Sequence, residues 1–170
     1  ILFLGRIHPI KGLDILAKAF GRIAKDRDDI CLMIAGPDSE GYQAQVEAML
    51  RSESALDKTI FTGMLTGSKK RAALGGADLL VIPSYSEVRS IVALEAMICK
   101  LPVIITHQCN FPEVAEARAG LIIEPNADKL AEALLKLLDD PKLRQEMGEN
   151  GRRLILEKFT WDKIVDQMIR

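Results

Sequence analysis

The sequence predicts one α/β domain in which a parallel sheet is covered by helices on both faces, a doubly wound, Rossmann-like arrangement. Two observations predict it. Short, continuous apolar runs alternate with longer amphipathic segments along the chain, and strands that are apolar throughout are typical of a parallel sheet buried on both faces. The chain has 170 residues, of which 48% are hydrophobic, enough for a single domain with a substantial core.

In the first half of the chain, glycines end the predicted strands, and helical periodicity follows each glycine. Leu13, Leu16, Phe20 and Ile23 recur at the spacing of one helix face. We expect strands over residues 1–4, 30–35 and 59–62, and helices over residues 13–26, 42–51 and 68–74, the last one stopped by two glycines.

The second half repeats the pattern, with clear helix-start signals. Asn126 is a typical N-cap, Pro141 suits the first turn of a helix, and Thr160 is placed to cap the last one. We expect strands over residues 79–82, 102–106 and 120–123, and helices over residues 90–99, 111–117, 127–138, 141–158 and 161–170.

The stretch between the fourth strand and its helix carries two carboxylates, Glu87 in the loop and Glu95 in an otherwise apolar helix. A helix that is apolar all round is normally buried, and a carboxylate inside it is costly without a partner. Both residues follow a strand end, where ligands bind in open α/β sheets. The alternative is that Glu95 meets water and Glu87 is a solvated loop residue.

Composition excludes several classes of function. The net charge is −1 and no long basic run is present, which argues against nucleic acid as a partner. Cys31, Cys99 and Cys109 lack metal-site spacing and are expected to be reduced core residues. His8 and His107 lack partners at metal-ligand spacing, so we expect neither a metal nor a cofactor. No apolar run is long enough to span a bilayer, and we expect a cytoplasmic protein.

The loop after the first strand contains Arg6 and Lys11 and ends in Gly12. Two cations beside a helix N-terminus predict an anion site, with Arg as a planar fork and Lys as a point charge. Solvated basic residues are the alternative. Gly36 and Gly63 end the second and third strands, where they serve either a backbone approach to a ligand or an ordinary turn.

Together these features resemble one family over essentially the whole chain: the C-terminal, donor-binding domain of the group 1 (family 4) glycosyltransferases, which have the two-domain GT-B fold. The matching segments are Gly5-Arg6-x4-Lys11-Gly12, Ile34-Ala35-Gly36-Pro37, Phe61-Thr62-Gly63, Ala77-Asp78-Leu79, Pro83-Ser84, Glu87-x7-Glu95-Ala96-Met97 and Leu101-Pro102-Val103.

The resemblance implies a retaining transferase that moves a mannose- or glucose-type hexose from a UDP- or GDP-sugar to a glycan, a lipid or another acceptor. Arg6 and Lys11 would hold the diphosphate, Glu87 the donor sugar, and Glu95 the ribose; the first three would be catalytic. The other implied donor-binding residues are Gly5, Gly36, Gly63, Met64, Leu65, Val88, Arg89, Ser90 and Ile91. Met64 and Leu65 would face the base.

The chain departs from the family pattern after Glu87, where Val88, Arg89 and Ser90 replace the usual Gly, aromatic and Gly, and at Lys100, where Gly is usual. Ser90 remains a good N-cap. A sugar-nucleotide 2-epimerase of similar fold and a non-catalytic nucleotide-binding module are the alternative functions.

The resemblance also implies a partner domain. Residue 1 already lies in a predicted strand, which suggests a piece of a longer chain. We expect a nucleotide-sugar-binding domain over residues 1–158 and, over residues 159–170, a helix that crosses toward an N-terminal acceptor domain. Contact with the inner face of a membrane would come through that domain.

Overall fold

The computed structural model describes residues 1–38, 40–88, 90–160 and 163. Its centre is a six-stranded sheet in the order β3-β2-β1-β4-β5-β6. Every adjacent pair runs parallel, which confirms the predicted fold class. The strands are β1 (Leu2–Leu4), β2 (Leu32–Ala35), β3 (Thr59–Gly63), β4 (Leu80–Ile82), β5 (Val103–Thr106) and β6 (Gly120–Ile123).

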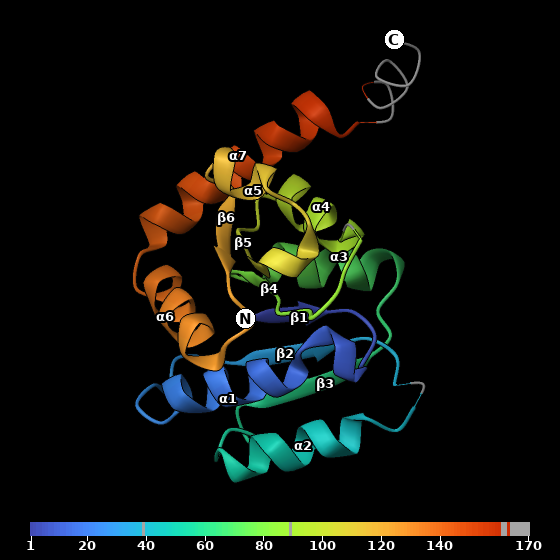
Figure 1. Cartoon of the computed structure of the whole chain (residues 1–170), viewed down its shortest axis with the longest axis vertical. Helices are drawn as coiled ribbons and strands as arrows, with labels where there is room; N and C mark the ends of the chain where they lie inside the picture. Colours follow the sequence, from blue (N-terminus) through green and yellow to red (C-terminus); the bar gives the residue numbers. More distant parts are fainter. Residues whose placement is uncertain (39, 89, 161–162, 164–170) are drawn as a thin grey trace.

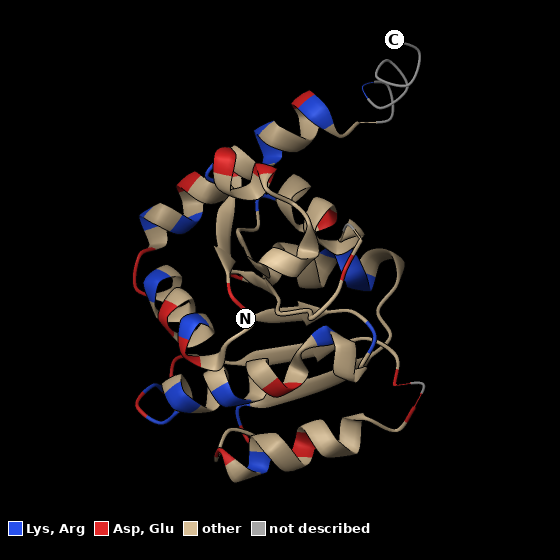
Figure 2. Cartoon of the chain, viewed as in Figure 1, with Lys and Arg blue, Asp and Glu red and all other residues tan. Residues whose placement is uncertain are grey.

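Helices cover both faces of the sheet (Figure 1). The first face carries α1 (Leu13–Ala24), α2 (Gln43–Ser52) and α6 (Ala127–Leu138), and the second carries α3 (Gly67–Gly76), α4 (Ile91–Ile98) and α5 (Glu113–Glu116). Successive strand residues point to opposite faces: Phe3 joins the first core, whereas Leu2 and Leu4 face the second. This alternation explains why the strands are apolar throughout. Figure 2 shows charged residues on the helices and loops rather than on the strands.

Helix α7 (Pro141–Lys158) connects the two layers (Figure 1). Its first half places Met147 in the core beneath α1 and α6, and its second half places Leu154 and Ile155 in the core beneath α4. Gly148 permits the close crossing, because a Cβ there would lie 2.1 Å from the carbonyl oxygen of Lys100. The helix therefore contributes to both hydrophobic cores.

Local start signals predicted the later helices well. Asn126 accepts hydrogen bonds from the backbone N–H groups of Asp128 and Lys129, and α7 spans the predicted range. Ser90 caps α4 by accepting from the N–H of Ala93. The end predicted for α3 was wrong, since both glycines of its last turn are helical. The short helix predicted over 111–117 is limited to α5, and the one expected over 161–170 lies outside the described residues.

Two expectations about burial were wrong. Cys31 and Cys99 are exposed, and only Cys109 is a core cysteine. Helix α4 is buried on one face only, because Ile91 at its start is 69% exposed. Cys31 lies directly before β2, and Ile91 and Cys99 lie at the two ends of α4. Burial around Cys109 also raises the pKa of its thiol.

The replacement of Gly by Lys100 has a visible backbone consequence. Lys100 follows α4 with φ of 62°, in the left-handed region that glycine adopts most easily. Its ammonium donates to Glu149 at 2.7 Å, an exposed contact. Within the described part of the chain, no helix is long and apolar enough to cross a membrane.

Candidate functional site

The strand order reverses between β1 and β4, which are neighbours in the sheet. In open α/β sheets such a reversal leaves a crevice beyond the carboxyl ends of the strands. A cavity of about 220 Å³ lies there. Gly5, Arg6 and Lys11 line it from the loop after β1, and Ser84, Glu87, Ser90 and Ile91 line it from the loop after β4 and the start of α4. The structure thus brings together most of the predicted diphosphate and sugar residues.

Lys11 and Glu87 meet in this cavity. The ammonium of Lys11 lies 2.5 Å from Oε2 of Glu87, and the two side chains are only 17% and 20% exposed. The hydroxyl of Ser84 lies 3.5 Å from the same oxygen. Glu87 is therefore not a solvated loop residue, and a ligand that uses Lys11 must compete with this carboxylate.

Arg6 lies on the rim of the same cavity and is exposed. Among the residues that the structure describes, it forms no ion pair, whereas Lys11 does. The cavity thus offers one engaged cation and one cation facing solvent. A cavity lined by two cations, only one of them in an ion pair among the described residues, suits an anion that contacts both.

The short distance between the two loops depends on Gly12, which has φ of 69°. A Cβ at this position would lie 2.0 Å from the carbonyl oxygen of Pro83, so only glycine allows the start of α1 to approach the loop after β4. Tyr85 reinforces the contact. Its backbone N–H donates to the carbonyl of Ile10 at 2.8 Å, and its hydroxyl donates to Asp14 at 2.8 Å.

The Tyr85 phenol titrates abnormally. Burial first, and then the hydrogen bond to Asp14, raise the pKa of Tyr85 to about 12. A phenol with the ordinary pKa of about 10 is already protonated at neutral pH, and the raised pKa lets Tyr85 continue to donate to the Asp14 carboxylate at more alkaline pH. This bond ties the loop that carries Glu87 to the first turn of α1.

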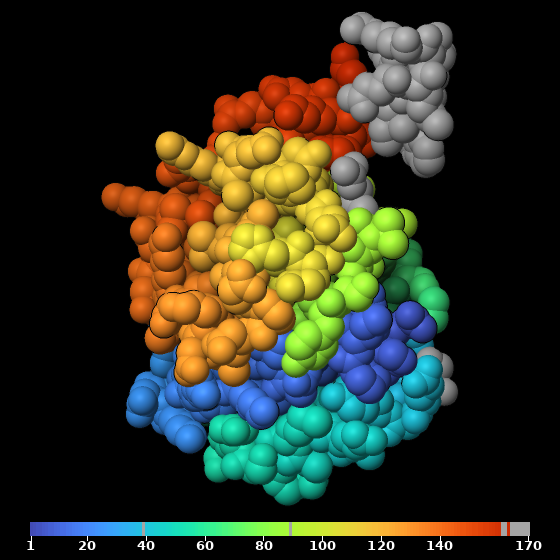
Figure 3. Space-filling model, in the orientation of Figure 1, coloured from blue at the N-terminus to red at the C-terminus, as the bar shows by residue number. Residues whose placement is uncertain are grey.

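The loop after β5, with the 3-10 helix η2 (His107–Cys109), holds the Glu87 loop from its other side. The Glu87 N–H donates to the carbonyl of Gln108 at 3.1 Å, and the side-chain amide of Asn110 donates to the Glu87 carbonyl at 2.9 Å. In Figure 3 the yellow-green loop after β4 lies between the dark-blue segment after β1 and the yellow segment after β5.

Thr106 adds a buried contact by donating to the Ser84 carbonyl at 2.6 Å. Our sequence analysis missed these supporting residues. The available signal was a polar side chain at the end of an apolar strand, as in Thr106, or two residues after one, as in Ser84.

Glu95 lies on α4 and is neither buried alone nor simply hydrated. Lys70 of α3 donates to its Oε1 at 2.7 Å. Sequence analysis missed this partner, because the two residues lie on consecutive helices of the same sheet face and no spacing rule connects them. Figure 2 shows basic residues at the start of α3, next to an acidic residue on α4.

The remaining predicted site residues differ in their exposure and in their contacts. Met64 is 68% exposed. Gly63 before it has φ of 67°, and a Cβ built on Gly63 would meet no atom within 4 Å. A Cβ on Gly36 would lie 1.7 Å from the Gly5 carbonyl oxygen, so the close approach seen there is to the chain's own backbone. Val88 is 92% exposed and does not adopt positive φ. Leu65 is half-buried, and Arg89 lies outside the described residues.

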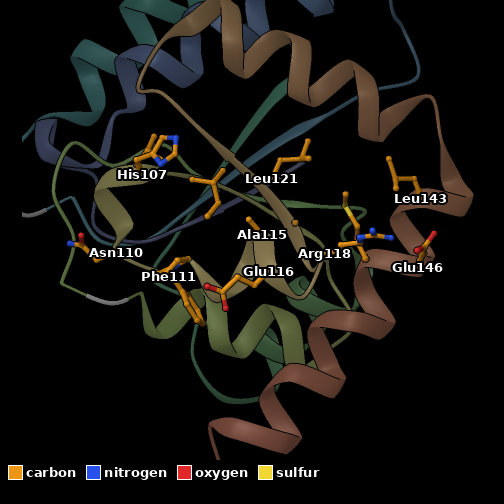
Figure 4. Close-up of a pocket in the computed structure, with 14 residues that line it drawn as sticks. His107, Asn110, Phe111, Ala115, Glu116, Arg118, Leu121, Leu143 and Glu146 are labelled. Atoms are coloured by element: carbon orange, nitrogen blue, oxygen red, sulfur yellow. The ribbon is translucent and has the colours of Figure 1, made fainter.

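A larger cavity lies elsewhere. It measures about 930 Å³ and follows β6, the edge strand, between α5 and the start of α7. Figure 4 shows His107 and Asn110 at one end of it and Arg118, Leu143 and Glu146 at the other. It contains none of the predicted site residues. The described residues include no group of three His, Cys, Asp or Glu side chains that could hold a metal ion.

Comparison with known proteins identifies the family. The sequence profile described as "Glycosyl transferases group 1" matches residues 1–154. The chain belongs to the group 1 glycosyltransferases. This agrees with the strand-end motifs from which the resemblance was first inferred.

Two relatives illustrate the range of this glycosyltransferase family. Alpha-maltose-1-phosphate synthase of Mycolicibacterium smegmatis is 32% identical over 99% of the chain, which covers 46% of that protein. The GDP-mannose-dependent monoacylated alpha-(1-6)-phosphatidylinositol monomannoside mannosyltransferase of Corynebacterium glutamicum is 33% identical over 92% of the chain, which covers 42% of that protein. The chain thus spans less than half the length of these relatives.

A solved structure corresponds to the same portion of a glycosyltransferase. The C-terminal domain of a group 1 glycosyltransferase (LpcC) from Francisella tularensis superposes with a TM-score of 0.84 at 26% identity. The match covers 94% of this chain and 85% of that domain. The chain therefore corresponds to the C-terminal, Rossmann-like half of a GT-B glycosyltransferase, as predicted.

Proposed function

We propose that this chain is the donor-binding domain of a retaining hexosyltransferase. It would bind a UDP- or GDP-sugar and present a mannose- or glucose-type hexose to a glycan, lipid or other acceptor held by an N-terminal domain. The observation that carries the proposal is the meeting of Lys11 and Glu87 where the strand order reverses, with Arg6 exposed on the same cavity. By their names, one of the two relatives described above is an alpha-maltose-1-phosphate synthase and the other is a GDP-mannose-dependent mannosyltransferase, which supports the proposal.

The proposed reaction breaks the bond between the anomeric carbon of the hexose and the diphosphate oxygen. The electron pair leaves with the diphosphate, whose growing negative charge Arg6 and Lys11 would stabilise as preorganised cations. The acceptor hydroxyl oxygen forms the new bond to the anomeric carbon on the face that the diphosphate leaves. Its proton passes to a base, which we assign to the acceptor domain.

The carboxylates have separate roles in this scheme. Glu87 would accept hydrogen bonds from hydroxyl groups of the hexose, next to the cations that hold the diphosphate. Glu95 would accept from the ribose hydroxyls, and the segment Gly63–Leu65 would face the base. The backbone N–H groups at the start of α4, after the Ser90 cap, would contact phosphate or sugar oxygens.

We also propose that the donor site works without a metal or cofactor. Arg6 and Lys11 would supply the positive charge that a divalent ion supplies in other glycosyltransferases. EDTA should then leave the affinity for UDP or GDP unchanged in calorimetric titrations, and an affinity that depends on added Mg²⁺ or Mn²⁺ would contradict this part of the proposal.

The phosphate contacts can be tested by calorimetry with UDP, GDP, uridine and guanosine. Losing one of two charge-assisted contacts should cost about 1.5–3 kcal/mol. Arg6→Ala and Lys11→Ala should therefore weaken diphosphate binding by about one to two decades and change nucleoside binding little. Lys18→Ala, which removes an exposed cation of α1, is the control. Equal losses for both ligand types would reject the assignment.

Products distinguish the proposed function from its alternatives. Transfer releases UDP or GDP only when an acceptor is present and joins the hexose to it. An epimerase would interconvert sugar nucleotides without an acceptor, and a binding module would do neither. Chromatography of a reaction with and without acceptor separates these outcomes.

A further inference from the structure

The Glu95 carboxylate is held on one side by a helix that our sequence analysis did not connect with it. The Lys70 ammonium donates to Oε1 at 2.7 Å and lies 2.5 Å from Oε2. Both side chains are partly buried, with 29% of Lys70 and 36% of Glu95 exposed. A half-buried pair is screened by solvent less than an exposed one, so the contact restricts where the carboxylate can point.

Lys70 occupies an unfavourable position in its own helix. It lies in the first turn of α3, which contains no acidic residue, and its neighbours Lys69 and Arg71 are also basic. Cations near a helix N-terminus oppose the helix dipole, and neighbouring like charges repel. A residue that breaks local rules in this way often serves a functional site. Here the compensating contact is Glu95.

The Glu95 carboxylate retains free acceptor capacity. A carboxylate offers about four lone-pair positions, and a lysine occupies only part of them. Oε2 is buried, and among the described residues no donor is aligned with it as a hydrogen bond, although the Lys70 ammonium is close. An oriented carboxylate that is 36% exposed and keeps lone pairs beyond those that face Lys70 suits a ligand that brings O–H donors.

We propose that Lys70 is a positioning residue that orients Glu95 to accept hydrogen bonds from the vicinal hydroxyl groups of a ribose. The inference rests on the proposed function, in which Glu95 contacts the ribose of a nucleoside diphosphate. Lys70 touches no substrate in this scheme. It balances the charge of the carboxylate and fixes its orientation, which leaves the lone pairs that do not face Lys70 for the ligand, so the site selects ribonucleotides over nucleotides without the diol.

Nucleotides that lack the diol make the test specific. Calorimetry measures the affinities of UDP and GDP and of their 2′,3′-dideoxy counterparts. The readout is the affinity of the ribonucleotide divided by that of its dideoxy counterpart. In Lys70→Met the ratio should fall by about tenfold, through weaker binding of the ribonucleotide alone. Lys70→Arg should retain most of the ratio, because a guanidinium also donates to a carboxylate. Lys69→Met and Arg71→Met, on the same helix and exposed, should leave it unchanged.

Two results would overturn the inference. Equal weakening of both nucleotides in Lys70→Met would make Lys70 a structural residue, and tighter ribonucleotide binding would show that it masks Glu95. Thermal unfolding of each variant reports stability separately. If Lys70→Met does not fold, the ratio is measured in Lys70→Gln, where a smaller decrease supports the inference and an unchanged ratio rejects it.

Glu95→Gln separates failure of this inference from failure of the proposed function. If Glu95→Gln lowers the ratio and Lys70→Met does not, Glu95 binds ribose without help from Lys70. If Glu95→Gln leaves the ratio unchanged, the ribose role in the proposed function is wrong, and the role of Lys70 falls with it.

Discussion

At the scale of single residues, the proposed donor site contains a contact between opposite charges. Lys11 and Glu87 neutralise each other across the cavity, with about one fifth of each side chain exposed. Because the two charges pair with each other, neither is left as an unpaired, partly buried charge, which would be unfavourable. A bound diphosphate would take over part of the Lys11 contact, which leaves Glu87 free to accept from the hexose.

This exchange predicts opposite effects on two ligands. Glu87→Gln should tighten UDP or GDP binding by about two- to tenfold, because it frees Lys11 and removes a negative charge near the phosphates. The extra affinity contributed by the hexose of a sugar nucleotide should fall. Calorimetry with UDP, GDP and their glucose and mannose conjugates measures both.

Glu124→Gln is the matched control for this change. Glu124 directly follows β6 at the same edge of the sheet, but its carboxylate is 70% exposed and faces His107 at 3.7 Å. The substitution should change the affinity neither for the free nucleoside diphosphate nor for its hexose conjugate. Weaker binding of the free diphosphate in Glu87→Gln would mean that Glu87 supports Lys11 rather than competing for it.

At the scale of elements, the loop after β5 acts as a brace for the loop after β4. Both backbone polar groups of Glu87 are engaged, the N–H by Gln108 and the carbonyl by Asn110. Asn110 itself adopts φ of 47°, a conformation that asparagine tolerates better than most residues. The position of the Glu87 carboxylate therefore depends on a loop that need not contact the ligand.

Removing the hydrogen bond from Asn110 should weaken binding of the hexose donor more than it lowers the stability of the fold. In Asn110→Ala the Glu87 carbonyl loses its donor, so the affinity for a UDP- or GDP-hexose should fall by about fivefold, since a hydrogen bond contributes about 1 kcal/mol. Asn150→Ala removes a similar bond, from Asn150 to the Arg118 carbonyl at 3.1 Å, away from the cavity. It should lower stability without changing affinity. Identical affinities for both variants would contradict the brace.

Local signals explain which elements were predictable. Caps at Asn126 and Ser90 and the proline that opens α7 are encoded by neighbouring residues, so their elements were placed correctly. The partners of Glu95 and Glu87 were not predictable, because Lys70 and Asn110 reach them from other elements across the tertiary structure. The close approach of Gly36 to Gly5 likewise depends on how two loops pack.

At the scale of the whole molecule, the carboxyl edge of the sheet exposes large apolar side chains beside the charged cavity. They come from the loops after β1, β3 and β4 and from the start of α4, and they are Ile10, Met64, Tyr85, Val88 and Ile91, between 38% and 92% exposed. Apolar groups gathered at one edge are typical of an interaction surface. This agrees with an acceptor domain placed opposite the donor site.

We therefore expect the 170-residue chain to fold and bind UDP or GDP weakly, but to transfer no sugar. Transfer requires closure around the donor to exclude water and align the acceptor, which one half of the active site cannot provide. The rate of sugar transfer is measured with radiolabelled UDP- and GDP-sugars and a panel of acceptors, both for this chain and for a chain extended by an acceptor domain. Comparable turnover in both would place the base here, with Glu87 and His107 as candidates.

Helix α7 has a consequence for how the domain opens and exchanges its amide protons. Because Met147 lies in one core and Leu154 in the other, detaching the helix uncovers apolar surface on both faces of the sheet at once. Opening of either layer is thereby coupled to opening of its counterpart. The slowest-exchanging amides of β1, which touches both cores, should report a single cooperative unit, whereas the carboxyl-edge loops can fluctuate without disturbing it.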